Sequence, residues 1–317
     1  MKIIEAIDIK KYFKSKRISM GGDKNIVKAL DGINFSMEKG EIYSLVGETG
    51  SGKTTFCKIL LGLMPPTSGI VKINGNDLNI NDKKNLKMIR RKMQMIFQDP
   101  YESLDPRFKV KEIIEEPLKF NKIDYNKEKI IQLLSDVNLT PPEDFLDKYP
   151  HQLSGGQRQR VAIARALSIS PEFIIADEPV SMLDASLRAN FLNLLLDLNK
   201  KYNVSILMVT HDISIAAYTS KKISVLYFGK IVEEGLIKDV LNNPLHPYTQ
   251  ILIKSIPTLG KKDEKFEFKI SDITNKNTNI EGCKFYPKCP FRMDICKIKV
   301  PDLKNIGSEH SVACHLY

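Results

Sequence analysis

The sequence lacks long apolar runs, and this absence argues against a membrane-spanning helix. No stretch reaches the roughly 18–20 consecutive apolar residues that a membrane-spanning helix needs. The first ten residues, MKIIEAIDIK, alternate apolar and polar side chains like a β-strand and contain no apolar core of a signal peptide. We therefore expect a protein that stays in the cytoplasm and that binds a membrane, if it meets one, without spanning it.

Cysteine is scarce through most of the chain. Of five cysteines, Cys57 stands alone, and the other four lie between residues 283 and 314. Disulfides are rare in cytosolic proteins, so a cluster of this kind predicts bound metal or an iron–sulfur cluster. Cys57 is expected to be a small packing residue. The sequence also has no long internal repeat and no long heptad run.

The composition is that of a soluble globular protein. The 317 residues are 42% hydrophobic and 27% charged, enough apolar material for a substantial core. The formal net charge is +10. This charge suits nucleic acid, anionic lipid headgroups or many phosphate contacts, and it does not choose among them.

Short apolar segments alternate with helical stretches along most of the chain. This alternation predicts an α/β fold with a mainly parallel sheet and helices on both faces. The expected strands are residues 41–46, 92–97, 172–177, 204–210 and 222–228. The expected helices follow residue 52, precede residue 92, follow residue 155 and span 186–202.

The alternation stops twice. Around residues 99–150 the strands disappear, which predicts a helical subdomain inserted into the sheet domain. Residues 258–281 are rich in Lys, Asp, Glu, Asn and Thr and are typical of a linker. The cysteine-rich segment follows this linker.

Residues 47–54, GETGSGKT, match the phosphate-binding pattern G-x-x-x-x-G-K-[ST] in full. They follow an apolar strand and precede a helical stretch, which is the context that the motif requires. Backbone N–H groups of such a loop curl around phosphate oxygens, Lys53 supplies positive charge, and the Thr54 hydroxyl can bind Mg²⁺. The expected nucleotide-binding residues here are Gly47, Glu48, Thr49, Gly50, Ser51, Gly52, Lys53, Thr54 and Thr55.

A second candidate site is acidic. Residues 173–178, FIIADE, form an apolar strand that ends in two carboxylates. Asp177 suits a ligand of Mg²⁺ or of its water, and Glu178 can polarise an attacking water. Alone, such a pair is more often a loop start or a helix cap. Together with a phosphate loop, it predicts nucleotide hydrolysis.

The third motif is LSGGQ at residues 153–157, followed by the helical sequence RQRVAIARAL. A helix N-terminus of this kind is an anion site. With this pentapeptide between a phosphate loop and an acidic strand end, the chain resembles the ATP-binding-cassette (ABC) ATPases. The resemblance covers residues 1–257 nearly continuously.

The resemblance assigns further roles by position. It implies that Ser154, Gly155, Gly156 and Gln157 contact nucleotide, as does Asp184 in SMLD. Catalytic roles fall to Glu178, to His211 in VTHD and to Gln98 in FQDP, and the Mg²⁺ ligands would be Thr54, Gln98 and Asp177. An aromatic residue near the N-terminus would stack on adenine. Its spacing points to Phe13, with Tyr12 as the alternative.

The family also implies a fold and an assembly. The fold would be a P-loop cassette with a RecA-like sheet core, an antiparallel β subdomain, an inserted helical subdomain at about residues 99–168 and a small cysteine-rich extension at 282–317. In this family the signature of one subunit closes over nucleotide held by another. One cassette per chain therefore implies a dimer with itself or with a sister ATPase, docked on two membrane permease subunits at the cytoplasmic face.

Several segments resemble the peptide and nickel importer branch. They are the insertion at residues 15–33, QMIFQDPYESLDPR at 94–107 and NPLHPYTQILIKSIP at 243–257. Asp105 replaces the asparagine usual in that branch. The resemblance implies uptake of oligopeptides or dipeptides, served by an extracytoplasmic peptide-binding protein. Nickel and other solutes share this type of cassette and remain open.

The four cysteines near the C-terminus add to the resemblance to the peptide and nickel importer branch. Cys283, Cys289, Cys296 and Cys314 are separated by gaps of 5, 6 and 17 residues. The pattern resembles a C-terminal motif of peptide-importer ATPases that in some members binds a 4Fe–4S cluster. From chemistry alone, four thiolates could also hold Zn²⁺, or they could remain free thiols. His310 and His315 are reserve ligands, more readily explained as polar surface residues.

A nucleic-acid or ribosome-acting cassette is the main rival interpretation. DNA-repair members carry long coiled coils between the two motifs, and residues 55–152 are too few for one. Translation-factor members have two cassettes in a chain, and iron–sulfur ribosome-recycling members carry their clusters before the cassette. We therefore expect no nucleic-acid partner.

Overall fold

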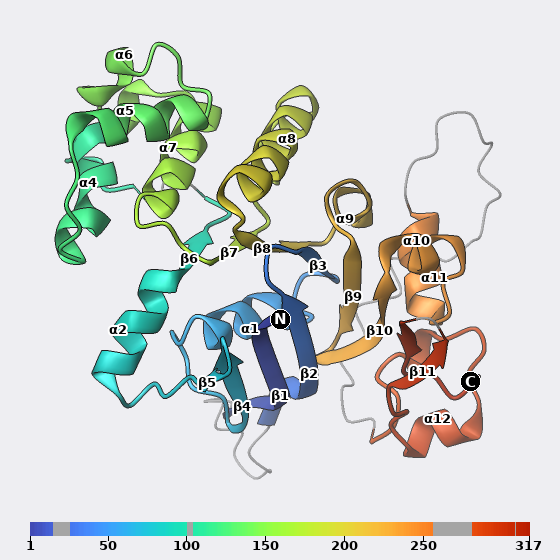
Figure 1. The fold of residues 1–317 in the computed structure, drawn as a ribbon. Helices are drawn as coiled ribbons and strands as arrows, with labels where there is room; N and C mark the ends of the chain where they lie inside the picture. Colours follow the sequence, from blue (N-terminus) through green and yellow to red (C-terminus); the bar gives the residue numbers. More distant parts are fainter. Residues whose placement is uncertain (15–25, 100–103, 256–280, 308) are drawn as a thin grey trace, which may run out of the picture.

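The computed structural model describes residues 1–14, 26–99, 104–255, 281–307 and 309–317 (Figure 1). Its strands are β1 (Lys2–Lys14), β2 (Ile26–Glu38), β3 (Ile42–Val46), β4 (Ser68–Ile73), β5 (Asn76–Asp77), β6 (Met93–Ile96), β7 (Phe173–Asp177), β8 (Ser205–Thr210), β9 (Lys222–Tyr227), β10 (Lys230–Leu236), β11 (Lys304–Gly307) and β12 (His310–Val312). Its α-helices are α1 (Lys53–Leu60), α2 (Lys83–Lys92), α4 (Val110–Phe120), α5 (Lys127–Asp136), α6 (Glu143–Leu146), α7 (Gly155–Leu167), α8 (Ala185–Tyr202), α9 (Ile213–Thr219), α10 (Ile237–Asn242), α11 (Pro247–Lys254) and α12 (Asp294–Ile298). Two 3₁₀ turns are η1 (Pro150–Gln152) and η3 (Tyr286–Lys288). In these ranges no helix is both long and apolar enough to cross a bilayer.

The main sheet has the strand order β11-β12-β10-β9-β3-β8-β7-β6. The strands β9, β3, β8, β7 and β6 are parallel, and they are the five strands predicted from sequence. Alternate residues of β7 enter different cores, Ile174 on one face and Ile175 on the other. Helices therefore cover both faces of this part of the sheet, as expected for apolar parallel strands.

The other three strands of the main sheet are antiparallel, and only the parallel part was predicted. The change begins at Phe228 and Gly229, which join β9 to β10 and have φ values of 42° and 77°. Two consecutive residues with positive φ form the type of turn that closes a tight antiparallel hairpin. β10 consequently runs back along β9, and β12 pairs with the other side of β10.

A second, antiparallel sheet has the order β2-β1-β4-β5 and matches the β subdomain implied by the resemblance. Ile4, Ile9 and Phe35 of this sheet share one apolar core with Phe56 of α1. The rings of Phe35 and Phe56 pack edge to face with centroids 5.5 Å apart. This sheet therefore packs against the helix that follows the phosphate loop.

Helices α4 to α7 lie between β6 and β7 in the chain and lie together above the sheet (Figure 1). They share one apolar core with residues of the sheet, among them Ile174 of β7. Their fully buried residues include Ile114, Leu134 and Val161. Between residues 97 and 172, the described part of the chain contains no strand, as the sequence predicted. Residues 100–103, within the importer-branch motif, lie outside the described residues.

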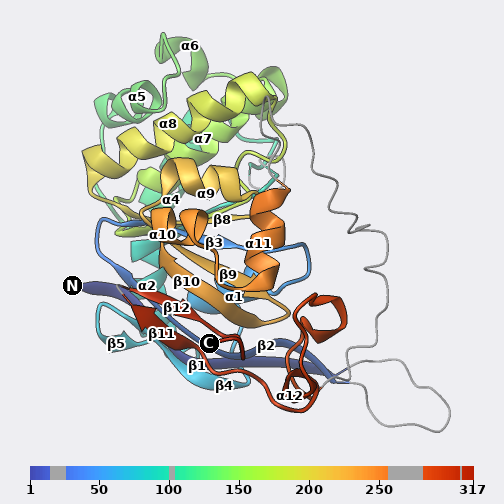
Figure 2. The ribbon, with the colours of Figure 1, turned by 90° about the vertical axis from the view of Figure 1, so that its right-hand side faces the viewer.

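The C-terminal segment, residues 281–317, includes the cysteine-rich extension expected at 282–317. Of the linker expected at 258–281, only residue 281 is described. Within the segment, β12 joins the main sheet by pairing with β10, with Val312 opposite Glu233 (Figure 2). Val312 is 0% exposed. Phe285 is 3% exposed and belongs to a core that also contains residues of β9 and α11. The segment packs as part of the cassette.

Candidate functional site

The phosphate loop, residues 47–54, joins β3 to α1 at the carboxyl end of the parallel strands. The backbone N–H of Gly229 donates to the carbonyl of Ser51 at 2.8 Å, which ties the loop to the β9–β10 turn. A Cβ atom at Gly47 would lie 2.2 Å from the carbonyl oxygen of Leu226. Only glycine fits at that position, so the strand packing explains the first glycine of the motif.

Lys53 lies inside the curl of this loop. Its ammonium donates to the carbonyls of Gly47 at 2.6 Å and Glu48 at 3.0 Å. Burial lowers the pKa of Lys53, while the carboxylates of Glu178 and Asp177 oppose that shift. Among the described residues, the buried Ser51 hydroxyl has no hydrogen-bond partner. A cation and an unsatisfied hydroxyl in one loop fit a bound phosphate chain.

Thr54 and Asp177 bring two oxygen donors together. The Thr54 hydroxyl donates to Asp177 Oδ2 at 3.2 Å. Asp177 ends β7, is 7% exposed, and has a pKa raised mainly by burial. Hard oxygen donors beside a phosphate loop are what Mg²⁺ prefers. These two side chains therefore fit the magnesium site expected from the sequence.

Glu178 and His211 follow the adjacent parallel strands β7 and β8 and meet at their ends. His211 Nδ1 lies 3.2 Å from Glu178 Oε2, and the Glu178 side chain is 16% exposed. Glu178 has a positive φ of 46°, and its N–H donates to the carbonyl of Val209 at 2.8 Å. This backbone arrangement directs a carboxylate and an imidazole to one place, where they can act on a water molecule.

The signature lies at the start of α7, among the helices above the sheet. Ser154 is the N-cap of α7, where its hydroxyl accepts from Gln157 N–H at 3.2 Å and its N–H donates to Gln157 Oε1 at 3.0 Å. Ser154 and Gly155 are exposed. In Figure 1, α7 lies with α4 to α6, apart from α1, which follows the phosphate loop.

The remaining predicted residues lie at the surface. Gln98 follows β6, and Asp184 is the N-cap of α8, and both are exposed. On β1, the Tyr12 hydroxyl donates to Asp31 at 2.5 Å, whereas the Phe13 ring is 38% exposed. The engaged Tyr12 leaves Phe13 as the aromatic that is more open to a base.

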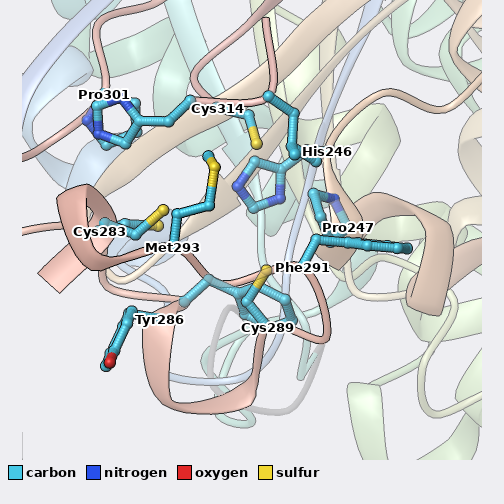
Figure 3. A pocket seen from close by; sticks show the side chains of 13 residues that line it. His246, Pro247, Cys283, Tyr286, Cys289, Phe291, Met293, Pro301 and Cys314 are labelled. Carbon is cyan, nitrogen blue, oxygen red and sulfur yellow. The ribbon is translucent and has the colours of Figure 1, made fainter.

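The four C-terminal cysteines line one pocket, together with His246, His315 and Met293 (Figure 3). Burial raises the pKa of Cys283 to about 11, and interactions with the other three cysteines add to this. Across the described residues, no group of three or more His, Cys, Asp or Glu is arranged to hold a single metal ion.

The roles expected for Cys57 and for the two C-terminal histidines were partly correct. Cys57 is 0% exposed in α1, which confirms its packing role. His310 is 7% exposed, so the prediction of a surface residue was wrong. Its Nε2 lies 2.8 Å from Glu233 Oε1, because β12 places it beside β10. His315 lines the cysteine pocket, and its Nε2 lies 2.9 Å from the carbonyl of Lys299.

Sequence reasoning missed Tyr248 and His246. The backbone N–H of Glu48, in the phosphate loop, donates to the Tyr248 hydroxyl at 3.0 Å. His246 is 1% exposed, and burial lowers its pKa to about 4. The only sequence signal was the HPYT element of the importer-branch motif, which says nothing of a partner 200 residues earlier.

Comparison with protein families identifies two regions. A profile described as "ABC transporter" matches residues 30–181, and one described as "Oligopeptide/dipeptide transporter, C-terminal region" matches residues 232–296. The second match spans the end of the cassette and the first part of the C-terminal segment, up to Cys296.

Individual relatives match almost the whole chain. The oligopeptide transport ATP-binding protein AppF of Bacillus subtilis is 41% identical, covering 99% of this chain and 97% of AppF. The dipeptide transport ATP-binding protein DppF of Escherichia coli is 40% identical, covering 98% and 93%. Among solved structures, the ATP-binding cassette MJ0796, a dimer in a post-hydrolysis state with ADP and Pi, is 34% identical with a TM-score of 0.64. That alignment covers 74% of this chain and 98% of the MJ0796 chain.

Proposed function

This chain belongs to the ABC transporter ATPases and has the oligopeptide/dipeptide transporter C-terminal region, and we propose from this that it is the ATP-hydrolysing subunit of a peptide importer. The observation that carries the proposal is 41% identity to an oligopeptide transport ATP-binding protein along 99% of the chain. The geometry supports it, because a phosphate loop, a carboxylate pair and a histidine meet at the ends of three parallel strands.

The phosphate loop would bind the triphosphate of ATP. Loop N–H groups and the Lys53 ammonium would hold the phosphate oxygens, with the ammonium leaving the carbonyls that now accept from it. Thr54, Asp177 and Gln98 would hold Mg²⁺, which when bound neutralises charge on the phosphates. Phe13 would stack on the adenine ring, since the Tyr12 hydroxyl is engaged by Asp31.

Glu178 would accept a proton from the attacking water or orient it. His211, 3.2 Å away, would stabilise the transferred phosphoryl group. The Glu178 side chain is 16% exposed at the end of a buried strand, whereas that of His211 is 55% exposed. Positioning and charge neutralisation of this kind supply most of the catalysis in phosphoryl transfer.

The site would be completed by a second cassette. The exposed Ser154–Gln157 end of α7 in the partner would close over the γ-phosphate, with Asp184 at the seam. The dimeric MJ0796 structure supports this arrangement. The partner would be a second copy or a sister ATPase. The assembled pair would dock on two permease subunits at the cytoplasmic face, with an extracytoplasmic peptide-binding protein delivering cargo.

The test is a transport assay in proteoliposomes that contain this chain, its sister ATPase and the two permeases. We expect short peptides, given with the peptide-binding protein, to stimulate ATP hydrolysis and to accumulate inside. The control is the same assembly with Ni²⁺ in place of peptide, which should stimulate neither process. Stimulation by Ni²⁺ alone would assign the cassette to metal uptake and overturn the peptide assignment.

We further propose that Cys283, Cys289, Cys296 and Cys314 hold a structural 4Fe–4S cluster. The support is their position around one pocket and the resemblance of their spacing to the cluster-binding motif. When bound, the cluster would act as a crosslink between η3, α12 and the chain end after β12. Zinc is the alternative occupant.

Metal analysis of protein purified without oxygen should find about four iron atoms per chain and a brown colour. Cys289→Ser should lose the iron and increase hydrogen exchange across residues 283–317, while hydrolysis at saturating ATP survives. The matched control is Cys57→Ser, which changes a buried thiol of α1 and should keep the iron. One zinc without iron would favour a tetrahedral site, and neither metal would leave four free thiols.

A further inference from the structure

The phosphate loop is held from outside by a tyrosine that no nucleotide-site motif contains. Tyr248 lies in the first turn of α11, is 1% exposed, and accepts a hydrogen bond from the N–H of Glu48 at 3.0 Å. The carbonyl of the same residue accepts from the Lys53 ammonium at 3.0 Å. Residue 48 is thus fixed at its N–H by Tyr248 and at its carbonyl by the lysine of the motif.

The hydrogen bond between Glu48 and Tyr248 helps to set the direction of the backbone N–H groups in the rest of the loop. Under the proposed function, the nucleotide would bind to backbone N–H groups of residues 49–54, whose direction depends on the peptide plane at residue 48. The far side of the loop is tied by the hydrogen bond from Gly229 N–H to the Ser51 carbonyl. Removing the Tyr248 hydroxyl would free one end of the curl and leave a partly buried N–H without its partner.

Tyr248 is in turn held by the C-terminal segment. The ring centroid of Phe285 lies 5.7 Å from that of Tyr248 and 5.3 Å from that of Tyr227. Phe285 is 3% exposed and stands two residues after Cys283. The ring of Tyr227 lies 4.4 Å from that of Tyr248. The three rings form one buried cluster between the cysteine pocket and the phosphate loop.

A second set of contacts joins the same elements. Glu233 on β10, 0% exposed, accepts from the N–H groups of Leu245 and His246 at 2.8 Å each, just before α11. The same carboxylate contacts His310 of β12 at 2.8 Å. The Tyr248 N–H donates to His246 Nδ1 at 3.1 Å. The start of α11 is therefore fixed by a carboxylate that the C-terminal segment shares.

We propose that Tyr248 is a positioning residue for the phosphate loop, and that the C-terminal segment holds it in place through Phe285, so that ATP affinity depends on the order of that segment. The proposal rests on ATP binding at the loop. It adds a role for the segment that is separate from docking or transport, because the contacts run from Phe285 through Tyr248 to residue 48.

The first experiment measures ATP binding by the full chain with calorimetry and ATP hydrolysis by the assembled transporter. Tyr248→Phe should raise the Kd and the KM for ATP by about tenfold, the scale of one buried donor left unpaired. The value of kcat should stay within about twofold of wild type, because Glu178 and His211 are untouched. An unchanged Kd for Tyr248→Phe would overturn the proposal.

The matched control is Tyr227→Phe. Tyr227 belongs to the same ring cluster and is 3% exposed, but within the described residues its hydroxyl makes no hydrogen bond to the loop. This variant should keep the wild-type Kd. Equal weakening in both variants would mean that packing of the cluster, and not the bond to Glu48, sets the affinity.

The second experiment tests the link to the C-terminal segment. Phe285→Leu should raise the Kd by a few-fold, and the double variant with Tyr248→Phe should bind no more weakly than Tyr248→Phe alone. Coupling between sites is reciprocal, so ATP should also slow hydrogen exchange in residues 281–307 of the wild-type protein. This arm needs no variant to fold.

Two results would overturn the link: additive losses in the double variant, or ATP-independent exchange in a wild-type protein that binds ATP. Wild-type protein that fails to bind ATP would instead refute the proposed function. The two failures are therefore distinguishable in one set of measurements.

Discussion

Replacing Glu178 with glutamine is expected to leave ATP binding intact and to lower steady-state hydrolysis by about 100-fold or more, the scale of losing a positioned base. The amide has nearly the shape of the carboxylate but cannot take a proton from water. Asp177 and the phosphate loop are unchanged, so binding should persist. The variant should accumulate as an ATP-bound dimer, which size-exclusion chromatography with ATP would detect.

Glu172→Gln is the matched control for this variant. Glu172 precedes the same strand β7 at its other end, where it pairs with Lys92 at 2.9 Å. Its loss changes a carboxylate of the same strand far from the phosphate loop, and hydrolysis should stay near wild type. Wild-type turnover in Glu178→Gln would remove Glu178 from the mechanism.

Lys53→Ala is expected to abolish ATP binding at working concentrations, with the Kd raised by at least about 100-fold. The change removes the cation that would face the β- and γ-phosphates. It also leaves the carbonyls of Gly47 and Glu48 without the ammonium that now donates to both. Loss of the charge and loss of the loop shape therefore both weaken ATP binding. Calorimetry with ATP measures the effect.

The control is Lys58→Ala, an exposed lysine in the last turn of the same helix α1. It removes the same charge from α1 without touching the loop, and its ATP affinity should match wild type. Circular dichroism would show whether Lys53→Ala keeps its fold. A folded Lys53→Ala protein with unchanged affinity would contradict the assignment of the phosphate loop.

The sequence predicted the parallel part of the fold closely, because the central strands β3, β7 and β8 are apolar runs buried on both faces. The segment expected at 172–177 is β7 at Phe173–Asp177, and that expected at 204–210 is β8 at Ser205–Thr210. The helix expected at 186–202 is α8, Ala185–Tyr202. Local hydrophobic patterns suffice to predict a strand when both of its faces are buried and a motif marks its end.

The C-terminal half of the sheet could not be predicted in the same way. β12 has only three residues, too few for a periodic pattern, and it pairs with β10 about 80 residues earlier. In the sequence, Phe285 is part of a polar, cysteine-rich segment, and only the fold places its ring beside that of Tyr227. Tyr248 belongs to no nucleotide-binding motif, and only the fold brings its hydroxyl to Glu48.

The pairing of β12 with β10 also bears on solubility. A strand at a sheet edge presents unpaired N–H and carbonyl groups that can pair with another molecule, and proteins keep such edges short or covered. β10 has seven residues, whereas β11 and β6, the strands at the two edges of the sheet, have four each. The C-terminal hairpin therefore replaces a long edge by a short one. A chain in which this hairpin loosens would present β10 to its neighbours and self-associate by strand pairing, even while its ATP site is still folded.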